Sequence, residues 1–523
     1  MTEVTVDGET LTPTDVVAVA RDDATVSIDP NGRKAVRVSR DRVESLIDSG
    51  QAVYGFNTGF GELVDTRIDD ADLEQLQSNL IRSHASGAGR ELEREEVRAL
   101  LVTRLNALVK GYSGVREVVV DHLQTMLNEG IHPAVRSRGS LGASGDLAPL
   151  AHLSLVLIGE GEADVDGEPE RLSGTAALET AGLEPLTLAA KEGLALINGT
   201  QLSAGLAAIR LVDARRVLEA ANAAGALTTE VTMGTTANCE PEINAVRPHR
   251  GQRTVASRIR RLTEESEIIA SHANCDRVQD AYSIRCLPQV HGAVSDALDH
   301  LEEAVEIELN SATDNPLVFA ADAVDPRATG TSDAAAISGG NFHGEPLALR
   351  LDYVTSALVE LAAISERRVD RIVNPNIQEE HLPPFLTTNS GLRSGFMIPQ
   401  YTAAALLNEL RSLGRPSTDS TPVSGGQEDH VSMSATSAHQ FARAVELART
   451  VVAIELLTAA QGAEFVDASI SHGAGTDAAY GLVRDVSPAV VEDRSLAPDI
   501  DAVDELIRSG CLEQTLRDHI DAA

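Results

Sequence analysis

The sequence predicts a mainly α-helical protein, with a long central helical bundle and a smaller mixed region at the N-terminus. Hydrophobic residues make up 43% of the 523 residues, but aromatic residues make up only 3% and tryptophan is absent. A core that consists mostly of Ala, Leu, Val and Ile favours closely packed helices. Four long segments carry apolar residues at helical spacing, namely residues 97–111, 202–225, 349–369 and 441–466.

The length of the chain exceeds what one hydrophobic core usually serves, so we expect a mixed region over residues 1–110 and a helical body over residues 111–523. Short runs in the mixed region favour strands, at Glu3–Val6 and Val36–Val38. In the helical body, the acidic residues 159–174 predict a surface hairpin or loop.

The charge of the chain is strongly acidic, because 79 Asp and Glu against 43 Lys and Arg leave a net charge of -36. Repulsion argues against nucleic acid or an anionic membrane as a partner. Only three basic residues are lysines (Lys34, Lys110 and Lys191), so the other 40 are arginines. Such a surface suits a salt-rich cytosol, where counterions screen self-repulsion; an ordinary acidic mesophilic protein is the alternative.

Signals for export, membrane insertion and cross-linking are absent from the sequence. The N-terminus has no apolar signal core, and no uncharged apolar run reaches the roughly 18 residues of a membrane span, so we expect a soluble cytoplasmic protein. The cysteines lack CxxC spacing, which predicts reduced thiols rather than a zinc site or a disulfide framework. They are Cys239, Cys275, Cys286 and Cys511.

The most informative segment is RGSLGASGDLAPLAH, from Arg138 to His152. Small residues at positions 142–145 permit backbone conformations that larger side chains forbid. A glycine-rich turn before a helix, with Ser144 or Asp146 as the N-cap, would have the same composition. The sequence has no phosphate-binding loop, no HExxH and no dinucleotide fingerprint that would supply other chemistry.

The residue order GSLGASGDLAPLAH closely resembles the signature of the aromatic amino acid ammonia-lyases. The likeness, to the histidine ammonia-lyases in particular, runs from YGFNTGFG at Tyr54 to QEDHVSM near residue 430. It implies a fumarase/aspartase-like helical architecture and a homotetramer whose chains share active sites. It also implies elimination of ammonia from L-histidine to give trans-urocanate, the first step of histidine degradation.

The resemblance further implies a prosthetic group that the chain makes from itself, 4-methylidene-imidazol-5-one. Ala143 and Gly145 would form the cross-linked ring, and Ser144 would lose its hydroxyl to become the exocyclic methylidene. A glycine amide is the least hindered backbone nucleophile, and a tight turn brings the reacting atoms together. Because no ordinary side chain is an electrophile, this group would fill that role without an external cofactor or a metal.

Three residues are implied to lie near the prosthetic group. Tyr54 is the preferred base for the β-proton of the substrate, and Tyr282 is the second choice. Asn198, in LALINGTQ, would donate to developing negative charge. On the residues alone, Tyr54 could be a packed loop aromatic, and Asn198 could belong to a common Asn-Gly turn.

Five residues are implied to contact the substrate. His84 and Glu428 would recognise or polarise the imidazole, a polar ring that needs partners in a dry pocket. Arg285 would hold the α-carboxylate through a bidentate pair. Gln279 would add a polar contact and Phe342 an aromatic wall. Without the resemblance, a lone His or Arg is more often a surface residue.

Other assignments remain open at some positions. The run Glu428-Asp429-His430 could be a metal site, but contiguous residues point in different directions and no partner ligands are apparent, so no metal is expected. Arg393 stands where the family pattern has Asn, and residues 413–426 match the family's loop only loosely. Both departures leave loop conformation and subunit contacts undecided.

Two other functions compete with the histidine reaction. A phenylalanine or tyrosine ammonia-lyase or an aminomutase would use the same prosthetic group, but His84 together with Glu428 argues against it. A helical assembly protein without activity is the alternative from another class, and the intact Ala143-Ser144-Gly145 argues against that. An assay for urocanate distinguishes the three.

We predict that molar salt substantially raises the thermal unfolding midpoint, because cations screen the repulsion within a chain of net charge -36. The measurement is thermal unfolding followed by circular dichroism across a salt series. A flat or falling midpoint would remove the salt adaptation and leave the enzymatic assignment untouched.

Overall fold

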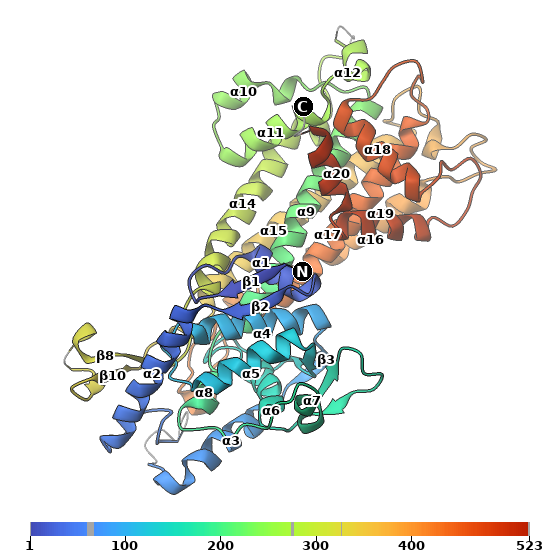
Figure 1. The fold of residues 1–523 in the computed structure, drawn as a ribbon. Helices are drawn as coiled ribbons and strands as arrows, with labels where there is room; N and C mark the ends of the chain where they lie inside the picture. Colours follow the sequence, from blue (N-terminus) through green and yellow to red (C-terminus); the bar gives the residue numbers. More distant parts are fainter. Residues whose placement is uncertain (1, 60–66, 274–276, 326, 521–523) are drawn as a thin grey trace. The chain divides into compact units, whose positions relative to one another are not determined.

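The structure is a computed structural model, and it describes residues 2–59, 67–273, 277–325 and 327–520 (Figure 1). Twenty α-helices dominate these residues, which confirms the predicted mainly helical class. None of the helices in these ranges is both long and apolar enough to cross a membrane. The described cysteines Cys239, Cys286 and Cys511 are free thiols.

The contacts within the chain define two compact units. The first comprises Met1–Val212, Leu301–Asp352 and Arg415–His439, and the second comprises Asp213–His300, Tyr353–Gly414 and Gln440–Ala523. These bounds differ from the expected division at residue 110, because residues 111–212 make their contacts within the first unit.

Four long helices contribute residues to both units. They are α9 (Gln201–Val231), α14 (Leu287–Leu309), α15 (Glu345–Val373) and α17 (Ser434–Ala463). Two of the four segments predicted as helices lie within α9 and α15, and nearly all of the other two lies in α17 and in α4 (Arg94–Val109). Residues 96–109 of α4 are all buried, as expected for a helix that is apolar on more than one face.

All strands among the described residues belong to small sheets of the first unit. The parallel pair is β1 (Glu3–Val6) with β2 (Thr25–Ile28), where Val4 lies opposite Val26. The antiparallel sheets are β3 (Ala88–Glu91) with β5 (Arg136–Arg138), β4 (Ile131–Pro133) with β6 (Glu162–Val165) and β7 (Leu172–Ser173), and β8 (Leu317–Ala320) with β10 (Ala334–Ile337) and β9 (Thr329–Gly330). The strand at Glu3–Val6 and the hairpin within residues 159–174 are therefore confirmed.

The expected strand at Val36–Val38 is wrong, because these residues lie in helix α2 (Pro30–Asp48). Asp29 caps the helix by accepting from the backbone N–H groups of Asn31 and Gly32, and Pro30 occupies the first helical position. The buried residues of α2, which include Val36, recur every three or four positions. The helical spacing of these buried residues therefore outweighs the local preference of valine for strands.

Three of the remaining helices of the first unit, α3 (Leu73–His84), α6 (Leu147–Leu157) and α8 (Glu192–Ile197), adjoin predicted site residues. The others are α1 (Pro13–Arg21), α5 (Glu117–Asn128) and α7 (Gly174–Thr180). Helices α3, α6 and α8 pack against one another (Figure 1). Because α3 ends at His84, α6 begins after Asp146 and α8 ends before Asn198, their packing brings three site-bearing ends into one region.

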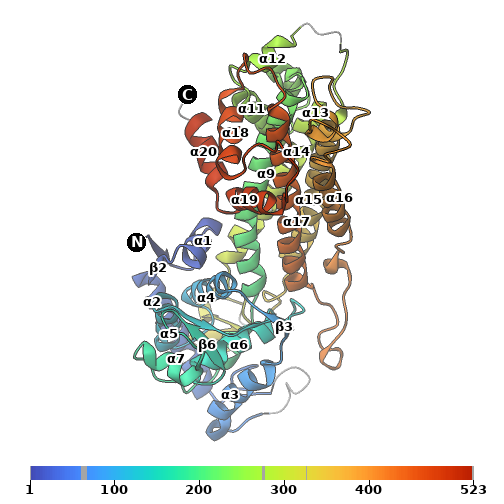
Figure 2. The same cartoon turned by 90° about the vertical axis from the view of Figure 1, so that its right-hand side faces the viewer.

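The second unit consists of helices and loops. Its shorter helices are α10 (Pro241–Ala245), α11 (Arg250–Leu262), α12 (Glu267–Ser271), α13 (Tyr282–Arg285), α16 (Met397–Arg411), α18 (Ala474–Val486), α19 (Ala497–Arg508) and α20 (Cys511–Ile520). Figure 2 shows α18, α19 and α20 packed together, and α11 also contacts α18.

A buried ion pair joins the long helices within the second unit. Arg368 Nε on α15 donates to Glu455 Oε1 on α17 at 2.5 Å, and both side chains are fully buried. Thr228 on α9 and Ser365 on α15 donate to the same carboxylate. Burial, together with the charge of Arg368, lowers the pKa of His291 on α14 well below its ordinary value. The hydrogen bonds to Glu455 fix the register of three packed helices, α9, α15 and α17, since each buried polar group needs its partner.

Candidate active site

The signature segment forms a tight turn between β5 and α6. The φ angles are +66° at Gly142, +54° at Ser144 and +76° at Gly145, all in the left-handed region that residues with side chains rarely adopt. Ala143 and Gly145 are buried, whereas Ser144 is partly exposed. The turn therefore presents Ser144 and encloses its two neighbours.

Gly145 lies against the backbone of Gly199. A parallel bridge joins the two glycines, and a Cβ on Gly145 would collide with the backbone nitrogen and oxygen of Gly199. The N–H of Asp146 donates to the Gly199 carbonyl at 2.6 Å. Only glycine fits at position 145. Asn198 was predicted from the motif, with a common Asn-Gly turn as the alternative, but Gly199 was not, although a glycine at such a position permits a close backbone approach.

Three predicted residues meet at this turn. The side-chain N–H of Asn198 donates to the carbonyl of Ser144 at 3.0 Å, and Ser144 Oγ donates to Glu428 Oε1 at 3.2 Å. Asn198 Oδ1 is buried and has no hydrogen-bond partner among the described residues. A buried acceptor without a partner is costly, so this amide oxygen is available to a bound group.

His84 ends helix α3 and faces the charge of Glu428. Its Nδ1 lies 2.9 Å from the carbonyl oxygen of Leu80, which can only accept, so in the neutral ring Nδ1 carries the proton and Nε2 is an acceptor. Burial lowers the pKa of His84, while the hydrogen bond to Leu80 and the charge of Glu428 oppose that shift. The lowered pKa favours the uncharged form of the His84 imidazole, in which the Nε2 lone pair can accept a hydrogen bond.

A buried carboxyl that the sequence analysis did not select organises the turn. Asp146 accepts from Ser140 Oγ at 2.6 Å and from the backbone N–H of Ser203 at 2.9 Å. Ser140 Oγ in turn accepts from the N–H of Gly142 at 3.0 Å. Burial raises the pKa of Asp146, and the hydrogen bonds from Ser140 and Ser203 oppose the rise. In the sequence, Asp146 resembled an ordinary helix cap, which concealed this role.

A second carboxyl, on the partly buried Glu308, is affected by the charge of Asp146. Burial raises the pKa of Glu308 to about 7, although Thr200 donates a hydrogen bond to it, and the charge of Asp146 adds to the rise. Thr200 directly follows the Asn198-Gly199 pair. No motif marked Glu308, because it is brought here from a helix more than 100 positions along the chain.

Two distant segments clamp the turn from its other side. The N–H of Gly344 donates to the Gly142 carbonyl at 2.9 Å, and Ser432 Oγ donates to the same oxygen at 2.8 Å. The N–H of Met433 donates to the carbonyl of Leu141 at 2.7 Å. Phe342, two residues before Gly344, is therefore carried on a segment bound to the turn, and it is partly buried.

Tyr54 lies in a turn that packs on the helix before Asn198. The Asn57 side chain closes this turn by accepting from the N–H of Val53 at 2.9 Å and donating to the carbonyl of Gln51 at 2.9 Å. A Cβ on Gly55 would collide with Leu194 of α8. Tyr54 is partly buried and lines a cavity of about 640 Å³. The rest of the glycine-rich segment, Phe60–Asp65, lies outside the described residues.

The other three predicted residues belong to the second unit. The guanidinium of Arg285 lies over the ring of Tyr282, 4.8 Å from its centroid. Arg285 Nε is buried and has no hydrogen-bond partner among the described residues, whereas 73% of Tyr282 is exposed. Gln279 is also exposed. The backbone carbonyls of Ile284 and Arg285 accept from Asn238 and hold helix α13 in place.

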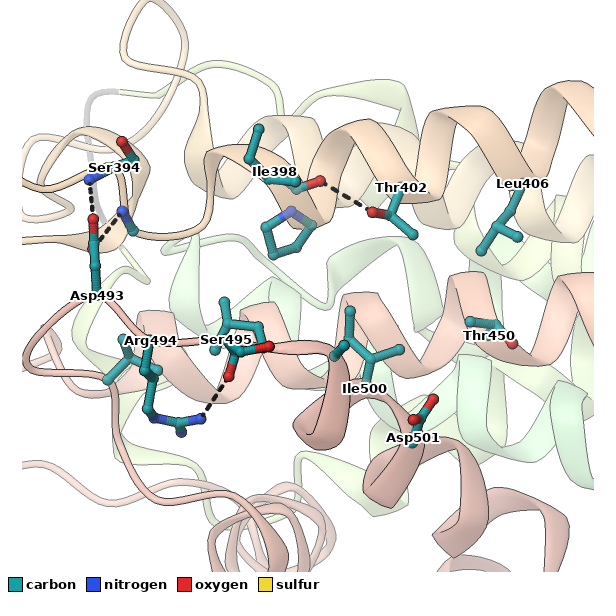
Figure 3. Close-up of a pocket in the computed structure, with 15 residues that line it drawn as sticks. Ser394, Ile398, Thr402, Leu406, Thr450, Asp493, Arg494, Ser495, Ile500 and Asp501 are labelled. Carbon is teal, nitrogen blue, oxygen red and sulfur yellow. Dashed lines mark hydrogen bonds between the residues drawn. The ribbon is translucent and has the colours of Figure 1, made fainter.

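The departure at Arg393 has a structural role within the second unit. Its guanidinium donates to the carbonyl of Val491 at 2.6 Å and to Glu492 at 3.1 Å. Asp493 accepts from the backbone N–H groups of Ser394 and Gly395, as Figure 3 shows. These contacts border a cavity of about 570 Å³ among α16, α17 and α19, whose lining contains none of the predicted site residues.

We predict that Gly142→Ala lowers the free energy of unfolding more than Gly182→Ala does. Both glycines have nearly the same φ, +66° and +69°, so the backbone strain is matched. A Cβ at position 182 meets nothing within 4 Å, whereas one at position 142 lies 2.8 Å from Ser434 N and collides with the hydroxyls of Ser432 and Ser434. The difference should be about 1 to 3 kcal/mol by urea denaturation. Equal losses of unfolding free energy in the two variants would show that Ser432 and Ser434 can move aside for a Cβ at position 142.

Known proteins with similar sequences cover almost the whole chain. Residues 11–485 match the family described as aromatic amino acid lyase. A probable histidine ammonia-lyase of Halobacterium salinarum is 65% identical and covers 99% of this chain and 98% of its own length. The histidine ammonia-lyase of Myxococcus xanthus is 48% identical, with 98% of each chain covered.

Solved structures share the fold over nearly the whole chain. The tyrosine aminomutase of Streptomyces globisporus has a TM-score of 0.92 at 36% identity, with 99% of both chains covered. The histidine ammonia-lyase of Trypanosoma cruzi has a TM-score of 0.89 at 40% identity, with 99% of this chain and 96% of that chain covered. The chain therefore belongs to the aromatic amino acid lyase family.

Proposed function

We propose that the chain is a histidine ammonia-lyase, which eliminates ammonia from L-histidine without oxidation to give trans-urocanate. The observation that carries the proposal is the position of Glu428, which accepts a hydrogen bond from Ser144 on the strained turn and whose charge acts on His84. The relatives from Halobacterium salinarum and Myxococcus xanthus, which bear this name, support it.

The same turn supports formation of 4-methylidene-imidazol-5-one from Ala143, Ser144 and Gly145. The amide nitrogen of Gly145 would bond to the carbonyl carbon of Ala143, and two waters would leave, the second from the Ser144 side chain. The left-handed turn and the bare Cα of Gly145 suit the ring, and Glu428 lies at the hydroxyl that must depart. Once formed, the group supplies an electrophilic carbon that no unmodified side chain offers.

The imidazole of the substrate would meet His84 and Glu428. With Nδ1 directed at Leu80, His84 offers the lone pair of Nε2 to the imidazole N–H, and Glu428 offers a carboxylate oxygen. A phenyl ring has no polar atom to pair with either group, so both would remain unpaired beside it. Unpaired buried groups are the physical basis of strong substrate discrimination.

The other predicted residues would have the following roles in the reaction. Arg285 would bind the α-carboxylate, since its guanidinium has a buried nitrogen without a partner among the described residues. Tyr54 would remove the β-proton, with Tyr282 as the alternative base. Asn198 would stabilise negative charge through its amide. Gln279 and Phe342 would complete the contacts with the substrate.

We also propose a homotetramer in which chains share active sites. Tyr282 is 73% exposed in the single chain, and so are large parts of Leu349, Tyr353 and Tyr401. Exposed large apolar side chains are typical of surfaces that another chain covers. Covering Tyr282 and Arg285 by a second copy would give these two residues the dry surroundings that their proposed roles require.

An aminomutase or a lyase for another aromatic amino acid is the second candidate. This candidate is favoured by the structural similarity of the chain to the tyrosine aminomutase of Streptomyces globisporus. The fold and the turn would serve either reaction, so only groups that distinguish imidazole from a benzene ring decide between them. Product analysis with histidine, tyrosine and phenylalanine separates the candidates.

We predict that Ser144→Ala lowers kcat for urocanate formation by about 10³-fold or more, because the electrophile cannot form. Intact mass should show wild-type chains lighter by two waters, whereas the variant cannot lose the second water. Ser154→Ala, a buried serine in α6, is the matched control and should keep the wild-type mass deficit and activity. Near-normal urocanate production by Ser144→Ala would overturn the central claim.

We predict that His84→Leu and Glu428→Gln impair turnover of histidine most. His84→Leu should lower kcat/KM for histidine by about 10- to 100-fold, and lower it less for phenylalanine, because only imidazole loses a polar partner. His519→Leu, on the exposed face of α20, is the control. For Glu428→Gln, a loss in kcat places the carboxylate in the transition state, whereas a change in KM alone indicates uniform binding. Wild-type preference in both variants would refute the substrate assignment.

A further inference from the structure

We propose that His343, Glu345 and His430 form a binding site for a divalent cation of the zinc class. Each offers one ligand atom, and these atoms all lie within 4.8 Å of one another. The residues come from two segments 87 positions apart, the approach to α15 and the loop before α17. In the sequence, only the contiguous run Glu428-Asp429-His430 suggested a metal site. His343 and Glu345 come close to His430 through folding.

The two histidine rings are already neighbours. His343 and His430 are parallel within 3°, with centroids 5.8 Å apart. His343 Nε2 lies 3.3 Å from the backbone carbonyl oxygen of His430, which can only accept. A proton on Nε2 leaves the lone pair of Nδ1 for a cation, and metal-binding histidines commonly donate their second N–H to a carbonyl in this way.

Glu345 provides the independent observation that a ligand is missing. Its Oε2 is buried and has no hydrogen-bond partner among the described residues. A buried carboxylate oxygen without a donor is costly, so this atom is available to a cation. Glu345 is also the first residue of α15, which fixes its backbone beside Gly344 and the turn at Gly142.

The set of ligands selects the cation. Two imidazoles and one carboxylate suit zinc, cobalt or nickel, whereas magnesium prefers oxygen ligands only. Tetrahedral zinc holds its ligand atoms roughly 3.3 Å apart. Side-chain rotation of the exposed His430 and of Glu345 can close the present separation. Three protein ligands leave the fourth position open to water.

The bound cation would link two segments that bear proposed site residues. Phe342 directly precedes His343, and Glu428 lies two residues before His430. A cation held by both segments would tie them to each other as well as to the turn. Binding to the folded chain alone raises the unfolding midpoint, and this effect does not depend on the proposed function.

The test uses chelator-treated full-length protein with its accessible thiols alkylated, because exposed Cys511 would also bind soft metals. Buried Cys239 does not compete, since burial raises its pKa to about 12. Co²⁺ is titrated without histidine, which is itself a chelator, and binding is followed by visible ligand-field absorption. We expect one Co²⁺ per chain, displaced by equimolar Zn²⁺ and retained in excess Mg²⁺.

Three variants test the ligands one at a time. His343→Gln, Glu345→Gln and His430→Gln should each weaken Co²⁺ binding at least tenfold, whereas His519→Gln should leave it unchanged. Circular dichroism checks that each variant is folded, and two folded variants are enough to test whether these residues bind Co²⁺. Unchanged affinity in the folded variants, or no Co²⁺ absorption from wild type at millimolar metal, would overturn the site.

Discussion

The buried carboxyl of Asp146 is the constraint on which the active-site turn depends. Its oxygens bind the side chain of Ser140 and the backbone of Ser203, and its own N–H binds Gly199. A buried carboxyl must have such partners, so moving any one of them would leave an uncompensated polar group. The turn that presents Ser144 is therefore held by the same carboxyl that begins helix α6 and touches the start of α9.

The clamped turn explains how a strained backbone persists at Ser144. Left-handed residues with side chains cost free energy and survive only where the surrounding structure over-determines them. Here Gly199, Ser432 and Gly344 bind the turn from three segments of the first unit. The second unit stabilises its own proposed residues by separate means, with Asn238 holding the helix that carries Arg285. Each unit thus holds its own proposed residues through hydrogen bonds within that unit.

Periodic features of the sequence were predictable because they depend on local geometry. The four long apolar segments gave helices, since a spacing of three to four residues is a property of each segment by itself. The same rule explains the error at Val36–Val38, where three residues were too few to reveal the helical period of α2. The resemblance located Ser144 and its neighbours, because contiguous motifs survive in the sequence as readable order.

The helical class, the lyase family and the candidate turn at residues 142–145 could be predicted from the sequence, because apolar period and motif order are local properties of the chain. Which distant residues come into contact depends on folding. Asp146, Gly199 and Glu308 are single residues of common types, and their roles arise from burial and close approach that no local pattern encodes. Likewise, His343 and His430 become neighbours only through folding, because contact between remote segments depends on the packing of the whole first unit.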